Sequence, residues 1–366
     1  MTARNYSSVA ADRRCKLRLL GLLLSSVPLT LFSGATSLAL PQSSPSTTWA
    51  VTIVLPPRLV ADRPATLAVL GVDGRLAEGV IVDLGSHSGI DVHVKTDKTG
   101  RAVFLAPSDA NVLIAKASGA SAAALIDPPN PPQAAISLPP VASQQDASPM
   151  CGGGFHGEAE ANHVRMNDDP ALILAASPEC VVVLAGPRVV PGAAKISMET
   201  GPATEYTVTT TLVALHFDPP MPPLVPGQKS NLVLHVQGSD RPLDIVVENK
   251  TPGILRFTRG DSQKLVTSGG AQNVAAIEIR TISTGDFSFH ARLLASPEPE
   301  IARRYLGAAA KIAPKDLRRQ VQNLANRLAH NPRDAQKVSM EIWKILSFTI
   351  EGDFRTLLNS AHAALE

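Results

Sequence analysis

The sequence has little net charge, few aromatic residues and few cysteines. Lys and Arg number 34 and Asp and Glu 32 among 366 residues, so the formal charge is only +2. Nucleic-acid-binding proteins need a strongly basic surface, and this balance argues against that class. A mean hydropathy of +0.08 argues against a polytopic membrane protein, and 44% apolar residues argue against wholesale disorder. We therefore expect a folded chain of two to three domains, at about 150 residues for each domain.

Motifs that would name a reaction are also missing. The chain has no His-Glu-x-x-His helix motif, which a catalytic zinc site would need. The segment Gly85 to Gly89 carries His87 where the nucleophile elbow of a hydrolase needs serine. The Gly-rich run Thr267 to Asn273 lacks the lysine of a phosphate-binding loop. We therefore expect no enzymatic activity and no cofactor.

The first 39 residues have the organisation of an export signal. A basic segment from Arg13 to Arg18 precedes an apolar run from Leu19 to Phe32, and small residues at Ser37 and Ala39 suit cleavage before Leu40. The apolar run is shorter than the roughly 20 residues that span a bilayer, although a retained anchor is the alternative. We expect an exported protein that is periplasmic, in the cell envelope or extracellular. Membrane contact is expected only through the signal, if it stays uncleaved.

Two cysteines remain once Cys15 leaves with the signal. Cys151 and Cys180 are an even pair in a chain bound for an oxidising compartment, which favours a disulfide. Closing this loop of about 30 residues would stabilise the fold by about 3 to 4 kcal/mol. A metal-binding or catalytic thiol is the alternative, but neither cysteine has a C-x-x-C partner.

Residues 49–140 show the pattern of a β-sandwich. Short apolar runs alternate with turn residues every eight to twelve positions, as in Val80 to Leu84, where every second residue is apolar. Asp73-Gly74 and Asp97 to Gly100 mark tight turns between such runs. The apolar residues at every second position are expected to face a common core.

Three stretches of this region, 55–67, 72–82 and 96–107, resemble known modules. They look like bacterial immunoglobulin-like repeats of the invasin and intimin type and like carboxypeptidase-regulatory-type sandwiches. In those families a Thr-Asp-x-x-Gly-x-Ala turn precedes a strand with a core-filling aromatic residue, and Thr96 to Ala102 followed by Phe104 matches this pattern. The resemblance implies an immunoglobulin-like fold that serves adhesion, spacing or docking.

The rest of the chain continues in modules. The prolines between Pro128 and Pro132 and the polar run Ala142 to Pro149 predict an interruption, and alternating apolar residues return between Tyr206 and Leu294. The fold class is therefore mainly β and multi-domain, with immunoglobulin-like β-sandwiches and a C-terminal α-helical hairpin or small bundle. The expected parts are a signal peptide at 1–39, an Ig-like sandwich at 49–140, a linker at 141–150, a small disulfide-bearing β unit at 151–203, a second Ig-like sandwich at 204–296 and a helical region at 297–366.

The hydrophobic period changes to that of a helix after Pro297. Apolar residues from Leu317 to Leu328 fall at steps of three and four, which predicts a helix from just after Pro314 to near Asn331. Further apolar stripes predict a second helix through Val338 to Thr349 and a last short one through Phe354 to Ala361.

Two features of this helical region are candidates for function. Trp343 lies beside an apolar stripe and is either core or an anchor for a partner; we expect core. A basic stretch is either a contact for anionic lipid or a solvated surface, and its irregular spacing favours solvent. Its members are Arg303, Arg304, Lys311, Lys315, Arg318 and Arg319.

The densest group of metal-ligating side chains is His156, Glu158, Glu160 and His163. Two imidazoles and two carboxylates within eight residues are suitable ligands for a divalent metal. On a strand, however, His163 would face away from the other three, so a four-ligand site needs a turn between them. An exposed polar strand edge explains the same pattern, and we expect no metal here.

The sequence therefore predicts an exported, non-catalytic binding or scaffold protein of the bacterial cell envelope. Its partner is expected to be a protein or another envelope component and not nucleic acid. One alternative is a metal-dependent hydrolase that uses His156 and His163. A second is a carbohydrate-binding accessory protein, for which two Trp and three Tyr supply few aromatic platforms.

Overall fold

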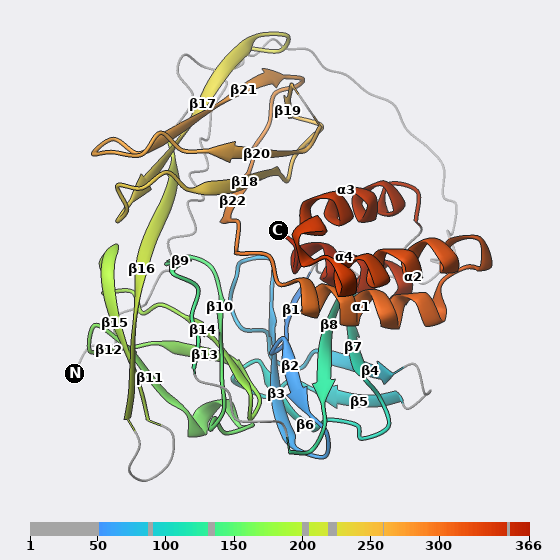
Figure 1. The fold of residues 1–366 in the computed structure, drawn as a ribbon. Coiled ribbons are helices and arrows are strands. Elements are labelled where there is room, and N and C mark those ends of the chain that lie inside the picture. The colour runs from blue at the N-terminus through green and yellow to red at the C-terminus, as the bar shows by residue number, and fades with distance from the viewer. Residues whose placement is uncertain are drawn as a thin grey trace, which may run out of the picture.

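The computed structural model describes residues 51–86, 91–130, 136–199, 205–218, 225–258, 260–349 and 352–366. In this part of the chain, three β-sandwiches follow one another and a group of helices comes last (Figure 1). The mainly β, multi-domain fold class with a C-terminal helical bundle is confirmed. The expected signal peptide at residues 1–39 lies outside the described residues.

The first sandwich has the strand order of an immunoglobulin-like domain. One sheet contains β1 (Thr52–Val54), β3 (Pro64–Leu70) and β6 (Arg101–Leu105), with β3 in the middle. The other contains, in spatial order, β2 (Arg58–Val60), β8 (Ala120–Asp127), β7 (Val112–Ala117), β4 (Ile81–Ser86) and β5 (Asp91–Lys95). β2 runs parallel to β8, and the other pairs within the two sheets are antiparallel. Consecutive strands form the hairpins β4–β5 and β7–β8 within one sheet and otherwise cross between the two sheets, as in a Greek-key sandwich.

Alternation along the strands builds the core of this sandwich. Ala102 and Phe104 of β6 are buried between the sheets, whereas Val103 between them is exposed. Phe104 therefore fills the core, as the resemblance to bacterial Ig-like repeats implied. The preceding turn is fixed by Asp97, whose carboxylate accepts hydrogen bonds from the Thr99 hydroxyl and backbone, and these bonds hold the pKa of Asp97 below its usual value.

Gly100 completes this turn because only glycine fits there. Its φ is +69°, and a Cβ atom at this position would lie 2.6 Å from the Cβ of Leu76. Its backbone N–H donates to the carbonyl of Asp97 at 2.9 Å. The Asp-x-x-Gly spacing thus encodes a turn with a left-handed residue at its end.

The second sandwich extends a sheet of the first. β13 (Leu172–Ala176) pairs with β3 at Ala176 and Thr66, and β14 (Cys180–Leu184) and β10 (Ser148–Cys151) continue that sheet. The facing sheet contains β12 (Asp169–Pro170), β11 (His163–Met166), β15 (Gly192–Glu199), β16 (Glu205–Phe217) and β9 (Val141–Ser143). Buried residues of both sheets, such as Val181 and Ile196, fill the space between them.

Residues 141–150, which the sequence pattern predicted to be a linker, are part of this sandwich. β9 pairs parallel with β16, and β10 pairs antiparallel with β14. The linker was predicted from the polar run Ala142 to Pro149. Proline is tolerated in an edge strand, however, and β10 lies at the edge of its sheet. The β unit expected at 151–203 therefore begins ten residues earlier, at Val141.

The third sandwich shares a strand with the second. β16 pairs with β15 up to Leu212, and its last residues, Ala214 to Phe217, pair with β17 (Lys229–Gln237). β21 (Val274–Thr281) and β19 (Leu255–Phe257) complete this sheet, and the facing sheet contains β20 (Ser262–Val266), β18 (Asp244–Asn249) and β22 (Phe289–Leu293). One continuous strand therefore connects the two sandwiches.

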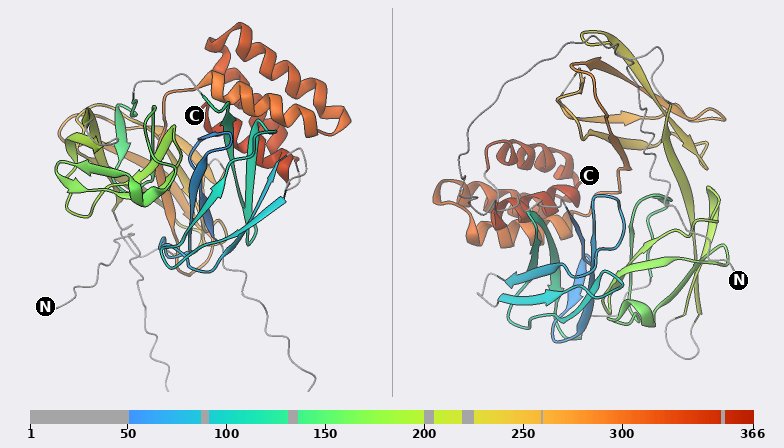
Figure 2. Two further views of the ribbon diagram at one scale, coloured as in Figure 1. Left: turned by 90° about the horizontal axis from the view of Figure 1, so that it is seen from below. Right: turned by 180° about the vertical axis from the view of Figure 1, so that it is seen from behind.

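The helical region follows the third sandwich in the chain but packs on the first sandwich (Figures 1 and 2). The α-helices are α1 (Pro299–Ile312), α2 (Lys315–His330), α3 (Ala335–Leu346) and α4 (Asp353–Ala363), and single 3-10 turns lie at η1 (Ala159–Ala161) and η2 (Pro332–Asp334). Val112, Ile114 and Leu125 of β7 and β8 join the helical core, while their strand neighbours face the sandwich core. This sheet is covered on both faces, which explains the continuous apolar run in β7.

Polar contacts fix the orientation of the bundle on the sandwich. Arg304 of α1 donates to the Asp127 carboxylate at 2.6 Å, and the buried Tyr305 hydroxyl donates to the Ala123 carbonyl at 3.1 Å. Burial raises the pKa of Tyr305 well above its usual value, so the hydroxyl stays a donor. α1 is therefore held in place by its inward-facing side chains.

Candidate binding surface on the helical bundle

The basic stretch at the start of the helical region divides into two groups. Arg303 donates to Glu300 at 2.7 Å, and this hydrogen bond holds the pKa of Glu300 below its usual value. Arg304 is paired with Asp127 of the first sandwich. The other four cations form no ion pair with any residue in the described part of the chain; they are Lys311, Lys315, Arg318 and Arg319.

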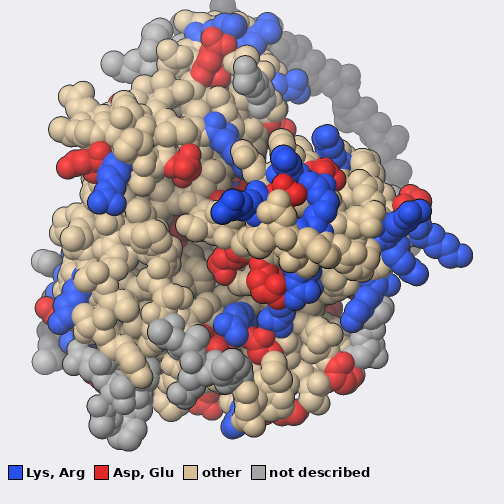
Figure 3. Space-filling view, in the orientation of Figure 1, with Lys and Arg blue, Asp and Glu red and all other residues tan. Residues whose placement is uncertain are grey.

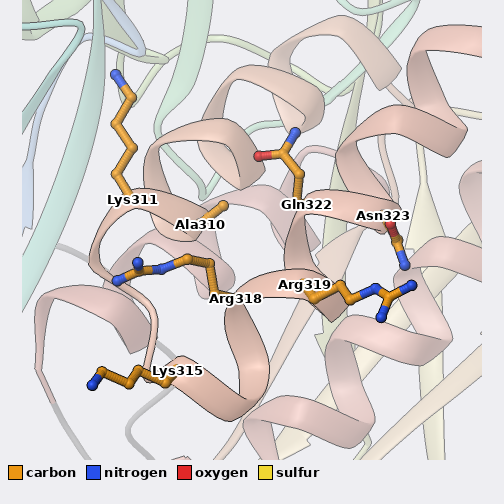
Figure 4. A pocket seen from close by; sticks show the side chains of 7 residues that line it. All are labelled: Ala310, Lys311, Lys315, Arg318, Arg319, Gln322 and Asn323. Atoms are coloured by element: carbon orange, nitrogen blue, oxygen red, sulfur yellow. The ribbon is translucent and has the colours of Figure 1, made fainter.

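These unpaired cations line one hollow at the corner between α1 and α2. The hollow is shallow and wide open to solvent, has a volume of about 620 Å³ and is also lined by Ala310, Gln322 and Asn323 (Figure 4). On α2, Arg318 and Gln322 are four residues apart, as are Arg319 and Asn323, so each pair lies on the same side of the helix. Helical periodicity alone is therefore a sequence signal that places Gln322 and Asn323 beside the basic stretch.

The electrostatics of the hollow favour an anionic ligand. Three of its cations lie in the first turns of α2, where the partial positive charge of the helix dipole makes cations unfavourable for helix stability. The free backbone N–H groups of such a helix start also attract anions. Asp316 is the acidic residue of the first turn and is exposed, so it offsets one of the four positive charges. The lining is thus a basic surface with two amide side chains that can donate hydrogen bonds.

The structure does not gather the metal-ligand candidates into a site. His156, Glu158 and Glu160 lie in a loop and in η1 and not on a strand, and His163 is the first residue of β11. All four side chains are exposed. In the described ranges, no group of three or more His, Cys, Asp or Glu residues is arranged to hold a metal ion. Asn162 organises this loop instead, since its side-chain amide bonds the backbone of His156 and Glu158.

Cys151 and Cys180 form the disulfide that the sequence predicted. They are directly opposite each other on β10 and β14, with their Cα atoms 4.1 Å apart. The backbone of Cys151 bonds that of Ser137 on its other side, so the two cysteines form a non-hydrogen-bonded pair, whose side chains lie closest across a sheet. The bond therefore fastens an edge strand to the interior of the second sandwich.

Trp343 is not part of the core, contrary to our expectation. Its side chain is 58% exposed, and the neighbouring Ile342 and Ile345 are the residues that pack inward. The centroid of the Trp343 ring lies 5.7 Å from that of the His362 ring. A helical wheel separates Trp343 from the inward stripe, because it lies about 100° from Ile342.

The triplet Asn249 to Thr251 is a glycosylation motif in sequence only. The Asn249 side chain is buried and donates to the Leu255 carbonyl at 2.6 Å, and its oxygen accepts from the backbone of Thr251. The amide nitrogen is thus occupied inside the third sandwich.

Comparisons with known proteins give little guidance. No protein-family model and no curated protein matches the chain. One similar solved structure is the SGBP-B protein of the Bacteroides ovatus mixed-linkage glucan utilization locus, bound to a heptasaccharide; it is 9% identical, with 70% of this chain and 63% of that chain covered and a TM-score of 0.18. The chain thus spans less than two thirds of that protein.

Immunoglobulin-domain proteins are also among the similar structures. The insect immune protein hemolin is 12% identical, with 66% of this chain and 73% of that chain covered and a TM-score of 0.21. Immunoglobulin domains 1–4 of Sidekick-1 are 8% identical, with 62% and 73% covered and a TM-score of 0.21. Scores this low carry no argument about function. The invasin, intimin and carboxypeptidase-regulatory families remain a resemblance, and the Ig-like fold rests on the strand order itself.

None of the described helices has the length and apolar character needed to cross a membrane.

Proposed function

We propose that the chain is an exported, non-catalytic binding or scaffold protein of the cell envelope, whose helical bundle binds an anionic component. The observation that carries this proposal is the basic hollow between α1 and α2. Its four cations have no carboxylate partner in the described residues, although Arg303 and Arg304 nearby each have one. Phosphate or carboxylate groups of a partner would supply the missing charge.

The packing of the helical bundle on the first sandwich supports a binding role. The inner faces of α1 and α4 are packed on the first sandwich, so the hollow is displayed by a fixed scaffold. The candidate residues of the hydrolase alternative, His156 and His163, are exposed and lie on different elements, which gives that alternative no support.

Binding to immobilised polyphosphate, used as a generic anionic probe, tests the proposal. We expect the unmodified protein to be retained at low salt and released by high salt, because exposed charges are screened. The variant Lys315→Glu/Arg318→Glu/Arg319→Glu should bind about tenfold more weakly or worse. These side chains are exposed, so the variant should remain folded.

A matched control carries the same change of charge elsewhere. Arg63, Lys95 and Lys98 are exposed cations of the first sandwich that have no ion-pair partner within the described ranges, and their joint replacement by Glu should lower retention only slightly. Equal losses in the two variants would show that net charge and not the hollow governs retention, and the proposal would then be abandoned.

A further inference from the structure

The outer face of α3 exposes three large apolar side chains. Met340 is 56% exposed, Trp343 is 58% exposed, and Phe348, just after the helix, is 62% exposed. The other exposed residues of this helix and its end are Gln336, Lys337, Lys344 and Ser347. Lys337 Nζ lies 3.6 Å from the carboxylate of Asp334, whereas Lys344 has no ion-pair partner among the described residues. Glu341 is half-buried at the border and is bound to Arg327 of α2 at 2.6 Å.

Folding does not explain this composition. Val338, Ile342 and Ile345 already bury the inner side of α3, and none of the three outer apolar residues belongs to the helical core. Large apolar residues that cluster on an exposed surface mark a contact with a protein or a membrane. A helix that carries Trp, Phe and Met together with Lys on its outward face has the composition of an interfacial membrane contact.

The basic hollow continues toward this face. Arg319, Asn323 and Arg327 of α2 are each four residues apart and therefore form one stripe along the helix. Arg319 and Asn323 line the hollow, and Arg327 is bound to Glu341 at the border of the α3 face. Figure 3 shows Lys and Arg side chains gathered over the bundle, on the right of the molecule. Cations and exposed apolar groups therefore occur on adjoining parts of one bundle.

We infer that the outer face of α3 inserts into the headgroup region of an anionic lipid bilayer, with Trp343 as its anchor. The inference rests on the proposed function, because the basic hollow supplies the attraction to the negative surface. Charge complementarity selects a membrane as the occupant, because Lys344 on the face and the four cations of the adjoining hollow have no carboxylate partner among the described residues. Indole rings also prefer the boundary between headgroups and acyl chains. A bilayer also accepts a convex helical surface, which needs no complementary groove.

Trp343 itself can report the contact. The chain has two tryptophans, so Trp49→Phe leaves Trp343 as the single emitter. The protein, with its N-terminus mapped to show that the apolar signal is gone, is mixed with phosphatidylcholine vesicles with and without phosphatidylglycerol. We expect co-flotation and a blue shift of emission with the anionic vesicles only, and quenching by lipids brominated near the headgroup.

Two variants separate the apolar contact from the charge. Met340→Ser/Phe348→Ser keeps the reporter and should weaken vesicle binding about tenfold while leaving polyphosphate retention unchanged. The equally exposed pair Val72 and Val266, replaced by Ser, is the matched control and should bind as the unmodified protein does.

Several results would overturn the inference. Flotation without a change in Trp343 emission would show that another surface meets the lipid, and absence of flotation would exclude the membrane. In either case, retention on polyphosphate would leave the proposed function standing, and loss of both kinds of binding would remove both. A blue shift that depends on protein concentration without vesicles would identify a second copy of the chain as the occupant and would also overturn it.

Discussion

The carboxylate of Glu366 accepts a hydrogen bond from Arg292 at 2.7 Å and joins the helical region to the third sandwich. Lys264 Nζ lies 2.7 Å and His362 Nε2 3.4 Å from the same carboxylate, of whose side chain only 7% is exposed. Arg292 and Lys264 belong to β22 and β20, on either side of β18. The bundle therefore contacts both the first and the third sandwich, and the described units form a closed series of contacts.

We predict that mild acid weakens this junction. Burial opposes ionisation of Glu366, but hydrogen bonds from Lys264 and Arg292 outweigh it and hold the pKa of Glu366 below 4.5. Burial lowers the pKa of His362 below 6.5, although Glu366 opposes that shift. Both folded-state pKa values lie below the unfolded ones, so the unfolded state binds more protons as pH falls. Stability present above about pH 6.5 is therefore lost, first through His362 and then through Glu366.

Urea unfolding at several pH values between about 7 and 5 measures this effect. The variant His362→Gln has no imidazole to titrate and should show a smaller decrease of unfolding free energy over this interval. His330 is an exposed histidine of α2, and His330→Gln is the matched control for the loss of an imidazole. An unchanged slope in the His362 variant would contradict the prediction.

The disulfide should account for a large part of the stability of the second sandwich. Joint replacement of Cys151 and Cys180 by alanine should lower the unfolding free energy by about 3 kcal/mol, because the unfolded chain regains a loop of about 30 residues. Denaturant unfolding of the variant measures the loss. Peptide mapping without reduction should join the peptides that contain these two residues, and two free thiols would contradict the assignment.

Asp127 should be critical for the packing of the helical bundle on the first sandwich. Its carboxylate is buried and accepts hydrogen bonds from Arg58 at 2.7 Å and from Arg304 at 2.6 Å. Asp127→Asn removes the charge that both guanidinium groups face and should cost about 3 kcal/mol. The exposed Asp83 of the same sheet is the control, and Asp83→Asn should change the unfolding free energy by less than about 0.5 kcal/mol. Equal effects would show that the cluster does not hold α1 in place.

Local patterns in the sequence were sufficient to predict many, but not all, elements of the fold. The alternation around Phe104 identified a strand with one buried face, and the stripe from Leu317 to Leu328 located α2 almost to the residue. The first helix, Pro299–Ile312, lies in the region that was predicted to be helical, but no separate helix was predicted before Pro314, although proline suits the first turn of a helix. The pairing of β16 with strands of two sandwiches was not predicted, because it depends on contacts between distant segments.

The candidate binding surface could be predicted from the sequence less completely than the elements of the fold. Arg304 is neutralised by Asp127, which lies 177 positions away in the chain, so the free cations become visible only after folding. The exposure of Trp343 depends on which side of α3 the other helices cover. Periodicity alone marks an apolar stripe but does not show where that stripe ends.

Leu125 should reveal whether the bundle and the first sandwich form one cooperative unit. Its side chain is fully buried between β8 and the helices, where Val112, Leu306 and other residues surround it. Leu125→Ala should therefore lower the unfolding free energy by about 2 to 5 kcal/mol through lost burial and the cavity left behind. Leu105 at the edge of the opposite sheet is 64% exposed, and Leu105→Ala should cost less than about 0.5 kcal/mol. Denaturant unfolding followed by far-UV circular dichroism and by Trp343 emission should give coincident transitions in both variants, whereas early loss of the helical signal in the Leu125 variant would show that the bundle unfolds by itself.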